Sequence, residues 1–238
     1  MWQQIQYKAG EKMISIAIDG PSGAGKSTIS RAAAKLFGFI YVDTGAIYRT
    51  IGLAAKLRGI DVSDNDAVIS MLPELRIELI YNESGEQCML LDGVDVSRDI
   101  RLPEVSMLAS KVSAIPEVRV YLVDMQRKMA QLHNVVMDGR DIGTVILPNA
   151  DLKIFLTAGA EDRARRRYEE LLKKGVETTF ESVLDDLIKR DEQDTRRAAA
   201  PLKAADDAVL LDTSGNTLEQ SVSEVCRLIS ERTGIKPE

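Results

Sequence analysis

Histidine and cysteine are scarce in this sequence. His133 is the only histidine among 238 residues, and the two cysteines, Cys88 and Cys226, lie far apart. A zinc site built from Cys and His needs several such ligands at short spacings, so this class of site is excluded. Two distant cysteines also argue against a disulfide framework. We read both cysteines as reduced, and His133, just before a predicted strand, as structural.

The sequence also lacks long apolar runs and an excess of basic charge. No run approaches the ~20 apolar residues that a membrane-spanning helix needs. The first residues, MWQQIQYKAGEK, lack the apolar centre of a signal peptide. The formal net charge is −6, which disfavours general nucleic-acid binding. We expect a cytoplasmic protein that binds neither nucleic acid nor membrane. We also expect a monomer, although no sequence feature requires one.

What the chain does have is a series of short apolar segments. Five of them are typical of buried strands: residues 14–19, 39–43, 135–138, 152–156 and 208–212. Helical patterns lie between strands, which predicts an α/β fold with a parallel sheet covered on both faces. Ligands of such sheets lie beyond the carboxyl ends of the strands. We therefore expect Asp19, Asp43 and Asp138 at one edge of the sheet.

A stretch in the first half of the chain interrupts this rhythm. Two β-rich segments surround residues 82–85, a hairpin signal, and a helical pattern broken near Pro116 follows. We predict a small inserted domain here. The predicted organisation is an N-terminal extension, an inserted domain and a core: residues 1–12, residues 60–118, and residues 13–59 with 119–238.

The segment GPSGAGKS, residues 20–27, matches the phosphate-binding loop (P-loop) pattern between a predicted strand and a predicted helix. Its glycines let successive backbone N–H groups face one anion, and the helix adds the positive end of its dipole. Lys26 should reach the β- and γ-phosphates, and Ser27 should bind Mg²⁺. The residues predicted to hold the nucleotide are Gly20, Pro21, Ser22, Gly23, Ala24, Gly25, Lys26, Ser27 and Thr28.

A P-loop indicates a phosphate donor and leaves the acceptor open. A GTP-dependent switch should carry a guanine-reading Asn-Lys-x-Asp sequence, which this chain lacks, and an AAA-type motor would be longer. A kinase for a small molecule fits the length better. The competing class is a nucleotide-binding regulator that hydrolyses its nucleotide or performs no catalysis.

Arginines follow two of the predicted strands at the expected ligand edge. Tyr48 and Arg49 follow the second strand, and Arg140 and Asp141 follow the third. An isolated arginine is usually a surface charge, but this position favours a ligand role. A phosphate acceptor is already an ionised nucleophile and needs positive groups rather than a base. Asp138 or Asp141 could act as a base, yet the excess of arginines favours a phosphate acceptor.

Residues 180–197 show a helical pattern that becomes charged at its end. The apolar stripe continues to Asp191 and Asp194, and Arg190 and Arg197 lie along its edge. These residues can form ion pairs on a solvated face, or they can line a cleft for an anion. We favour the cleft.

A second basic helical segment precedes this one. Residues 161–175 contain four arginines: Arg163, Arg165, Arg166 and Arg167. Such a run usually forms a solvated face that pairs with neighbouring glutamates. A lid that closes over a triphosphate needs arginines as well. We predict a short lid at about residues 161–175.

Four motifs, IAIDGPSGAGKST, DTGAIYR, DGRDIGT and RRAAAPL, occur in this order. With them the chain resembles the bacterial cytidylate kinases, from about residue 13 to residue 234. The resemblance implies a P-loop core with a five-stranded parallel sheet flanked by helices, an inserted domain that binds the acceptor nucleotide, and a short lid. It also implies phosphoryl transfer from ATP to CMP or dCMP, with Mg²⁺. A broader UMP/CMP kinase is the alternative.

The resemblance further implies roles for individual residues. Ser110, Arg119 and Asp141 match positions that recognise cytosine, and Asp194 matches the residue that holds the ribose hydroxyls. The matches to acceptor-phosphate contacts are Tyr48, Arg49, Arg140, Arg190 and Arg197. Thr44 stands where some relatives have serine and keeps the hydroxyl. Arg163 and Arg166 match basic lid positions near the donor nucleotide. The residues implied to act in catalysis are Lys26, Arg140, Arg190 and Arg197.

Overall fold

The protein folds into two compact units, seen in a computed structural model that describes residues 12–173 and 175–237. We call Val42–Leu132 the central unit, and Ile14–Tyr41 with His133–Glu238 the flanking unit. The predicted N-terminal extension, residues 1–12, lies outside the described residues except for Lys12.

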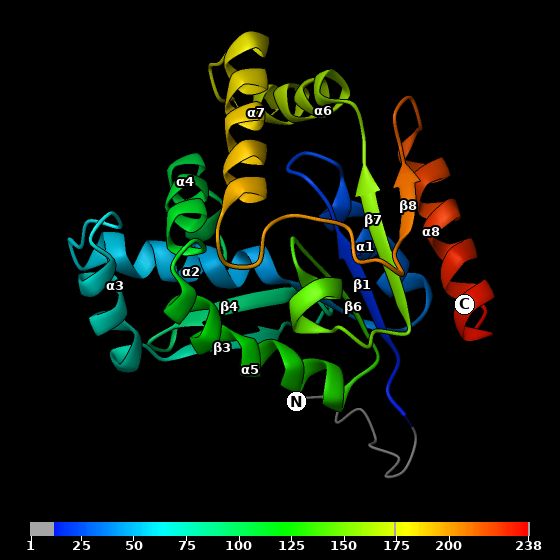
Figure 1. The fold of residues 1–238 in the computed structure, drawn as a ribbon, viewed down its shortest axis with the longest axis horizontal. Helices are drawn as coiled ribbons and strands as arrows, with labels where there is room; N and C mark the ends of the chain where they lie inside the picture. Colours follow the sequence, from blue (N-terminus) through cyan, green and yellow to red (C-terminus); the bar gives the residue numbers. More distant parts are fainter. Residues whose placement is uncertain (1–11, 174, 238) are drawn as a thin grey trace. The chain divides into compact units, whose positions relative to one another are not determined.

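The main sheet has five strands in the order β2-β6-β1-β7-β8 (Figure 1). The strands are β1 (Ser15–Asp19), β2 (Ile40–Asp43), β6 (Val135–Gly139), β7 (Leu152–Thr157) and β8 (Val209–Asp212). β1 pairs in parallel with β6 and β7, and β7 pairs in parallel with β8. The predicted parallel sheet and its five strands are thus confirmed. In this register Asp19 lies opposite Gly139, so the P-loop and the segment after β6 leave the sheet at the same edge.

Helices α1 (Lys26–Leu36) and α8 (Leu218–Thr233) pack on the main sheet. Apolar side chains of both helices share one core with side chains of the strands, such as Ile18 and Ile154. A capping box between Thr217 and Gln220 fixes the start of α8, because each side chain accepts a backbone N–H of the other residue. This core holds the strand ends that carry the P-loop.

Two further helices of the flanking unit follow β7: α6 (Ala160–Lys173) and α7 (Phe180–Arg196). They pack against each other around Ala164, Val183 and Leu187 (Figure 1). Ile188, the residue after Leu187, is by contrast 41% exposed. The α6 helix covers most of the predicted lid, of which residue 174 lies outside the described residues.

The central unit combines helices with a second, antiparallel sheet. Its elements are α2 (Thr44–Leu57), α3 (Asn65–Met71), η1 (Leu72–Glu74), β3 (Ile77–Tyr81), β4 (Gln87–Leu91), β5 (Val94–Asp95), η2 (Asp99–Arg101), α4 (Pro103–Val112) and α5 (Pro116–Leu132). β3 and β4 form the predicted hairpin, with Tyr81 opposite Gln87. The unit is wider than the predicted insert of residues 60–118, because α2 and α5 share an apolar core with the segments between them.

Close packing of α2 on α4 depends on Gly52. A Cβ at this position would lie 2.9 Å from Cβ of Leu108 and 3.1 Å from the backbone nitrogen of Ala109. Without that Cβ the two helices approach closely. Residues on α2 and on α4 are therefore held in a fixed relation within the central unit.

Candidate active site

The P-loop is the turn between β1 and α1, residues 20–27. Gly20 leaves β1 with a φ of 149°, and a Cβ on it would lie 1.9 Å from the carbonyl oxygen of Leu156. Only glycine fits here, because a side chain would collide with the backbone of β7. Gly25 then takes a φ of 84° directly before Lys26, the first residue of α1. The loop thus closes over the positive end of α1.

Lys26 is buried inside this loop. It is 5% exposed, and its Nζ donates to the carbonyl oxygen of Pro21 at 2.7 Å. Burial lowers the pKa of the Lys26 ammonium well below its ordinary value, and the charges of Arg140 and Arg190 lower it further. Two nearby carboxylates act in the opposite direction. An anion bound in the loop would stabilise the charged form of all three basic groups.

Ser27 and Asp138 form a pair beside the loop. Ser27 Oγ donates to one carboxylate oxygen of Asp138 at 2.9 Å, and Tyr41 donates to the other at 2.9 Å. Among the described residues, no group of three or more His, Cys, Asp or Glu side chains could hold a metal ion. One hydroxyl and one carboxylate are a partial oxygen set, which Mg²⁺ typically completes with phosphates and water. These two side chains therefore fit Mg²⁺ bound together with a nucleotide.

Asp19 holds the backbone that follows β6. Its two carboxylate oxygens accept the N–H groups of Ile142 and Gly143 at 2.8 and 2.7 Å. Burial raises the pKa of the Asp19 carboxyl to about 6, because these two donors offset burial only in part. The bonded residues begin η3 (Ile142–Ile146), a single π-helical turn. Asp19 therefore fixes the backbone directly after Asp141.

Arginines and carboxylates form a cluster in the flanking unit, which we call the arginine–carboxylate cluster: Arg140, Asp141, Asp194 and Arg197. Arg140 Nε donates to Asp194 at 2.8 Å. Arg197 lies 3.8 Å from Asp194 and 3.9 Å from Asp141, measured between nitrogen and oxygen, and these three side chains are each 6% exposed. The chain thus buries three charged side chains together, beside the partly exposed Arg140. A cluster of this kind is costly unless its charges are paired.

The pKa shifts show how close the basic groups lie. Burial alone would raise the pKa of the Asp194 carboxyl. Three arginines outweigh burial and hold this pKa below its ordinary value: Arg140, Arg190 and Arg197. Burial likewise lowers the pKa of Arg140, but Asp194 outweighs it and raises that pKa. Arg190 thus acts on both Asp194 and Lys26, and the structure brings the predicted arginines of the flanking unit together near the P-loop.

The two predicted lid arginines on α6 bind backbone carbonyls. Arg163 donates to the carbonyl oxygens of Ser22 at 2.7 Å and of Ala158 at 2.9 Å. Arg166 donates to the carbonyl oxygen of Thr213 at 2.6 Å. Their contact with donor phosphates stays a prediction. Arg163 nonetheless touches the P-loop directly.

In the central unit, the start of α2 is fixed by several side chains. Asp43 accepts the N–H of Ala46, which caps α2, and pairs with Arg49 at 2.8 Å. Gln87 of β4 accepts the Asp43 N–H at 2.7 Å and donates to the Asp43 carbonyl at 3.2 Å. Thr44, the next residue, is buried. The hairpin sheet thus holds the segment that positions Thr44 and Arg49.

Three more predicted residues lie near one another in the central unit. The Arg119 guanidinium carbon lies 5.4 Å from the ring centre of Tyr48, a cation–π distance. Arg119 also donates to the carbonyl of Ser113 at 3.0 Å, and Ser113 Oγ donates to the carbonyl of Ser110 at 2.9 Å. Tyr48, Ser110 and Arg119 are therefore connected within this unit. Asp141, predicted to share cytosine recognition with two of them, belongs to the flanking unit, so that shared role stays a prediction.

Several residues at the site carry contacts that the sequence did not reveal. Asp19 and Asp138 were expected at the ligand edge of the sheet, but the sequence did not predict which groups they bind. Asp191 continues the stripe of α7, and it accepts the N–H of Ser22 at 3.1 Å. Gln87 gave no signal, because its role depends on the folded hairpin.

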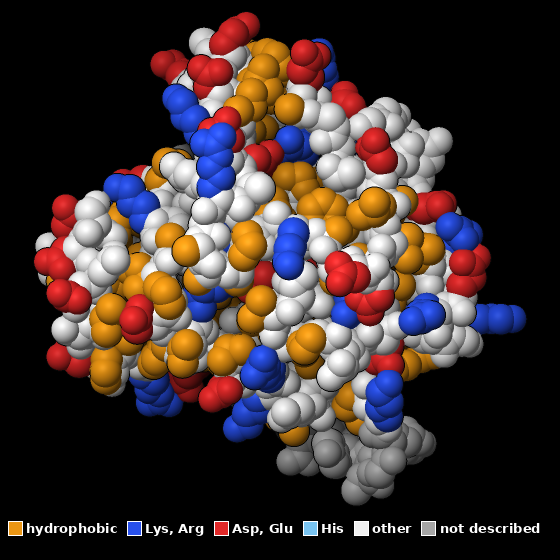
Figure 2. Space-filling view, viewed as in Figure 1, with side chains coloured by type: hydrophobic (Ala, Val, Ile, Leu, Met, Phe, Trp, Pro, Cys, Tyr) orange, Lys and Arg blue, Asp and Glu red, His pale blue; other side chains and the backbone are white. Residues whose placement is uncertain are grey.

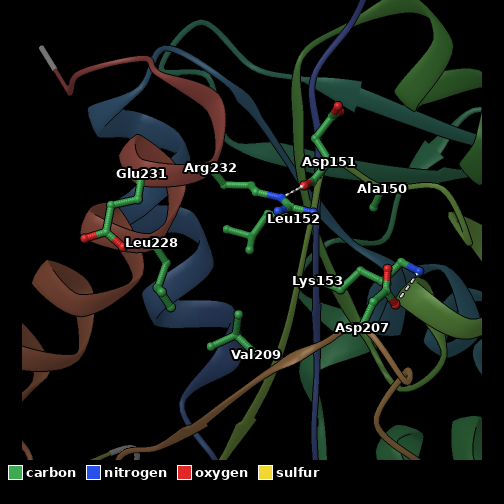
Figure 3. A pocket seen from close by; sticks show the side chains of 9 residues that line it. All are labelled: Ala150, Asp151, Leu152, Lys153, Asp207, Val209, Leu228, Glu231 and Arg232. Carbon is green, nitrogen blue, oxygen red and sulfur yellow. Dashed lines mark hydrogen bonds and ion pairs between the residues drawn. The ribbon is translucent and has the colours of Figure 1, made fainter.

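A cavity of about 300 Å³ lies elsewhere in the flanking unit, at the amino end of β7. Figure 3 shows its lining, including the Lys153–Asp207 ion pair at 2.8 Å and Arg232, which donates to the carbonyl of Asp151. The P-loop follows the carboxyl end of β1, which runs parallel to β7. The cavity is therefore at the opposite edge of the sheet from the P-loop.

The exposed surface carries both signs of charge. Lys and Arg side chains are interspersed with Asp and Glu side chains over the face shown in Figure 2. Within residues 12–173 and 175–237, no helix has the length and apolar character that crossing a membrane requires.

Comparison with known proteins identifies the family of the chain. The family model described as cytidylate kinase matches residues 16–231. A cytidylate kinase of Carboxydothermus hydrogenoformans is 47% identical over 92% of this chain and 99% of its own length. One of Caldanaerobacter subterraneus subsp. tengcongensis is 50% identical over 92% of this chain and 96% of its own.

One solved structure supports the fold. An uncharacterized protein from Eubacterium ventriosum aligns with a TM-score of 0.52 at 12% identity, over 92% of this chain and 100% of that one. At this identity the likeness concerns the fold alone. The family match and the two well-covered relatives show that the chain belongs to the cytidylate kinase family.

Proposed function

We propose that this protein transfers the γ-phosphoryl group of ATP to CMP or dCMP, giving ADP with CDP or dCDP, in pyrimidine nucleotide metabolism. The transfer is direct and in line, without a covalent enzyme intermediate. One observation carries the proposal: Arg140 pairs with Asp194 at 2.8 Å, Arg197 lies 3.8 Å from the same carboxylate, and the charge of Arg140 acts on Lys26 of the P-loop. Several positive groups beside a P-loop suit two reacting anions, because they bring the anions together against their repulsion.

The donor side rests on the P-loop. Backbone N–H groups of residues 20–28, apart from Pro21, and the end of α1 hold the phosphates of ATP. The Lys26 ammonium, now bonded to the loop's own Pro21 carbonyl, moves to the β- and γ-phosphates. The predicted lid, about residues 161–175, brings Arg163 and Arg166 toward the donor and excludes water.

The acceptor side rests on arginines. Arg140, Arg190 and Arg197 hold the phosphate of CMP, and Tyr48, Arg49 and Thr44 contribute further contacts to it. A phosphate monoester is an ionised nucleophile, so the enzyme needs no base to activate it. The arginines screen the repulsion between the two anions and orient the attacking oxygen.

Mg²⁺ fits beside the loop. Ser27 and Asp138 would hold it, because their 2.9 Å hydrogen bond already places a hydroxyl and a carboxylate together. When bound, Mg²⁺ neutralises charge on the β- and γ-phosphate oxygens. Tyr41 keeps the Asp138 carboxylate oriented through its own 2.9 Å hydrogen bond.

Cytosine is recognised by hydrogen bonds to its polar edge. The base presents an N4 amino donor and N3 and O2 acceptors. The Asp141 carboxylate accepts from the amino group, and Ser110 and Arg119 donate to the acceptors. Asp194 holds the ribose hydroxyls. We further propose that the protein works in the cytoplasm as a monomer, on small molecules rather than on nucleic acid or membranes.

A substrate panel tests the proposal. The purified protein is supplied with ATP, Mg²⁺ and one acceptor at a time: CMP, dCMP, UMP, AMP or shikimate. ADP and the nucleoside diphosphate are both measured. We expect the highest kcat/KM with CMP or dCMP. Best turnover with another acceptor, or similar rates with UMP and CMP, would contradict the assignment of the substrate. ATP hydrolysis that ignores CMP and yields no CDP would indicate the regulator class instead.

A further inference from the structure

A carboxylate outside the residues assigned above binds the P-loop. Asp191 lies on α7, and its Oδ1 accepts the N–H of Ser22 at 3.1 Å. Its Oδ2 accepts from Arg163 of α6 at 2.6 Å, and the same Arg163 Nη1 donates to the Ser22 carbonyl at 2.7 Å. Both backbone groups of Ser22 are thus bound by side chains of the helices that follow β7. We call these three residues the clasp.

The clasp is anchored and largely buried. The Arg163 side chain is 7% exposed and that of Asp191 19% exposed. Arg163 Nε also donates to the carbonyl of Ala158, directly after β7, at 2.9 Å. A pair buried to this degree is screened little by water, and losing one partner leaves the other without compensation.

The same helices touch the next residue of the loop. A Cβ on Gly23 would lie 3.2 Å from Cβ of Arg163 and 3.5 Å from Cδ1 of Leu187. The turn at Ser22 and Gly23 is therefore enclosed by α6 and α7 as well as by the loop's own sequence. Since the N–H groups after this turn must point at one anion, the path of the turn bears on phosphate binding.

We propose that Asp191 is a positioning residue for the phosphate donor, which holds the P-loop in its binding conformation through Ser22 and Arg163. This inference rests on the proposed use of ATP as the donor. It assigns a role to a residue of α7 that differs from that of Asp194, whose carboxylate pairs with Arg140. The predicted lid and the P-loop are then directly connected, because Arg163 lies in the lid segment and donates to the Ser22 carbonyl of the loop.

The test compares Asp191→Asn with a matched control on the same helix. Glu192→Gln removes a neighbouring carboxylate that is exposed and pairs with Arg196 only at 3.7 Å. Binding of ADP with Mg²⁺ is measured by calorimetry, and KM is measured separately for ATP and CMP. We expect Asp191→Asn to weaken ADP binding about tenfold and to raise KM for ATP, with little change in KM for CMP. Glu192→Gln should match the wild type.

Hydrogen exchange gives a readout independent of turnover. The amide of Ser22 should exchange faster in Asp191→Asn without nucleotide, since its acceptor has lost its charge and its arginine partner. Asp191→Ser, which removes the carboxylate and shortens the side chain, should share the loss in ADP affinity and serves if Asp191→Asn fails to fold. Unchanged or tighter ADP binding in the folded variant would overturn the proposal, tighter binding indicating that the carboxylate opposes the nucleotide.

Failure of this inference differs from failure of the proposed function. If the wild type makes no CDP, the proposed function fails, whatever the variants bind. If the wild type makes CDP and Asp191→Asn binds ADP as the wild type does, only the role of Asp191 fails.

Discussion

The P-loop and the arginine–carboxylate cluster hold charge by different means. The loop relies on backbone groups from eight consecutive residues, 20–27, shaped by glycines that tolerate no side chain. The cluster relies on side chains from two distant segments, with Arg140 and Asp194 joined by a 2.8 Å ion pair. A site made of backbone groups has its geometry once the chain follows the right path. A site made of side chains needs each of those side chains to be present and in place. Donor binding should therefore be sensitive mainly to changes in the loop and in the two side chains that hold Ser22, and acceptor binding to changes anywhere in the network.

The largest expected effect comes from Lys26, where the two regions meet. Lys26→Ala should lower kcat on the order of 10³-fold, because it removes the charge that follows the transferred phosphoryl group. Circular dichroism should show an intact fold. Near-normal turnover in the folded variant would mean that the loop does not act as a donor site.

Asp19 precedes the P-loop and binds the backbone after Asp141, so it connects the two regions. The next largest expected effect is that its ionisation makes stability depend on pH. Its pKa is raised from 3.8 to about 6, so it favours the folded state when protonated. The contribution of Asp19 to the free energy of unfolding is complete below about pH 4. It is lost as the pH rises through about 6, which lowers the free energy of unfolding by about 3 kcal/mol. Urea unfolding across this range should show the loss in the wild type.

Asp19→Asn supplies the control for this pH effect. Its unfolding free energy should lack the same loss, because the amide does not ionise. The difference between the two curves isolates Asp19 from other carboxyls, such as Asp194 with its lowered pKa. If the free energies of unfolding of the wild type and of Asp19→Asn changed with pH in the same way, the raised pKa of Asp19 would be contradicted.

Asp141 tests the acceptor side alone. Asp141→Ala should reduce the preference for CMP over UMP by roughly tenfold to a hundredfold, since one polar base contact is lost. Affinity for ATP should change little, because the P-loop is untouched. The ratio of kcat/KM values for CMP and UMP measures the effect. A ratio equal to that of the wild type would remove Asp141 from base recognition.

Gln87 should give the smallest effect. In Gln87→Glu the bond from Nε2 to the Asp43 carbonyl is lost and a carboxylate faces that oxygen, which loosens the segment of Thr44 and Arg49. We expect KM for CMP to rise about fivefold, with KM for ATP unchanged. Glu86→Gln, an exposed neighbour, is the control. An equal rise in KM for both substrates would point to a general loss of stability.

The two regions also differ in how far the sequence predicts them. The P-loop is contiguous, so its pattern and its place between β1 and α1 could be predicted residue by residue. The strands followed from short apolar runs that end in polar loops, and the helix that carries Asp194 followed from its 3.6-residue period. Arg197, expected on the same helix, instead follows its last residue with extended backbone.

Partners far apart in the chain could not be predicted in this way. Ser27 bonds to Asp138 across 111 positions, and Ser22 bonds to Asp191 across 169. Hydrophobic periodicity identifies a face but not the residue opposite it, so Asp191 showed only as a charged continuation of a stripe. The role of Gln87 likewise required the folded hairpin, because its amide acts on the backbone of Asp43 rather than on a side chain.

The central claim is that two anions, one held by the P-loop and one by arginines, react directly with each other. The stereochemistry of transfer tests it most directly. ATP made chiral at its γ-phosphorus with oxygen isotopes is reacted with CMP, and the configuration of the β-phosphoryl group in CDP is determined. A single in-line displacement inverts the configuration, which is the predicted result. Retention would require an enzyme-bound phosphoryl intermediate and would contradict the account.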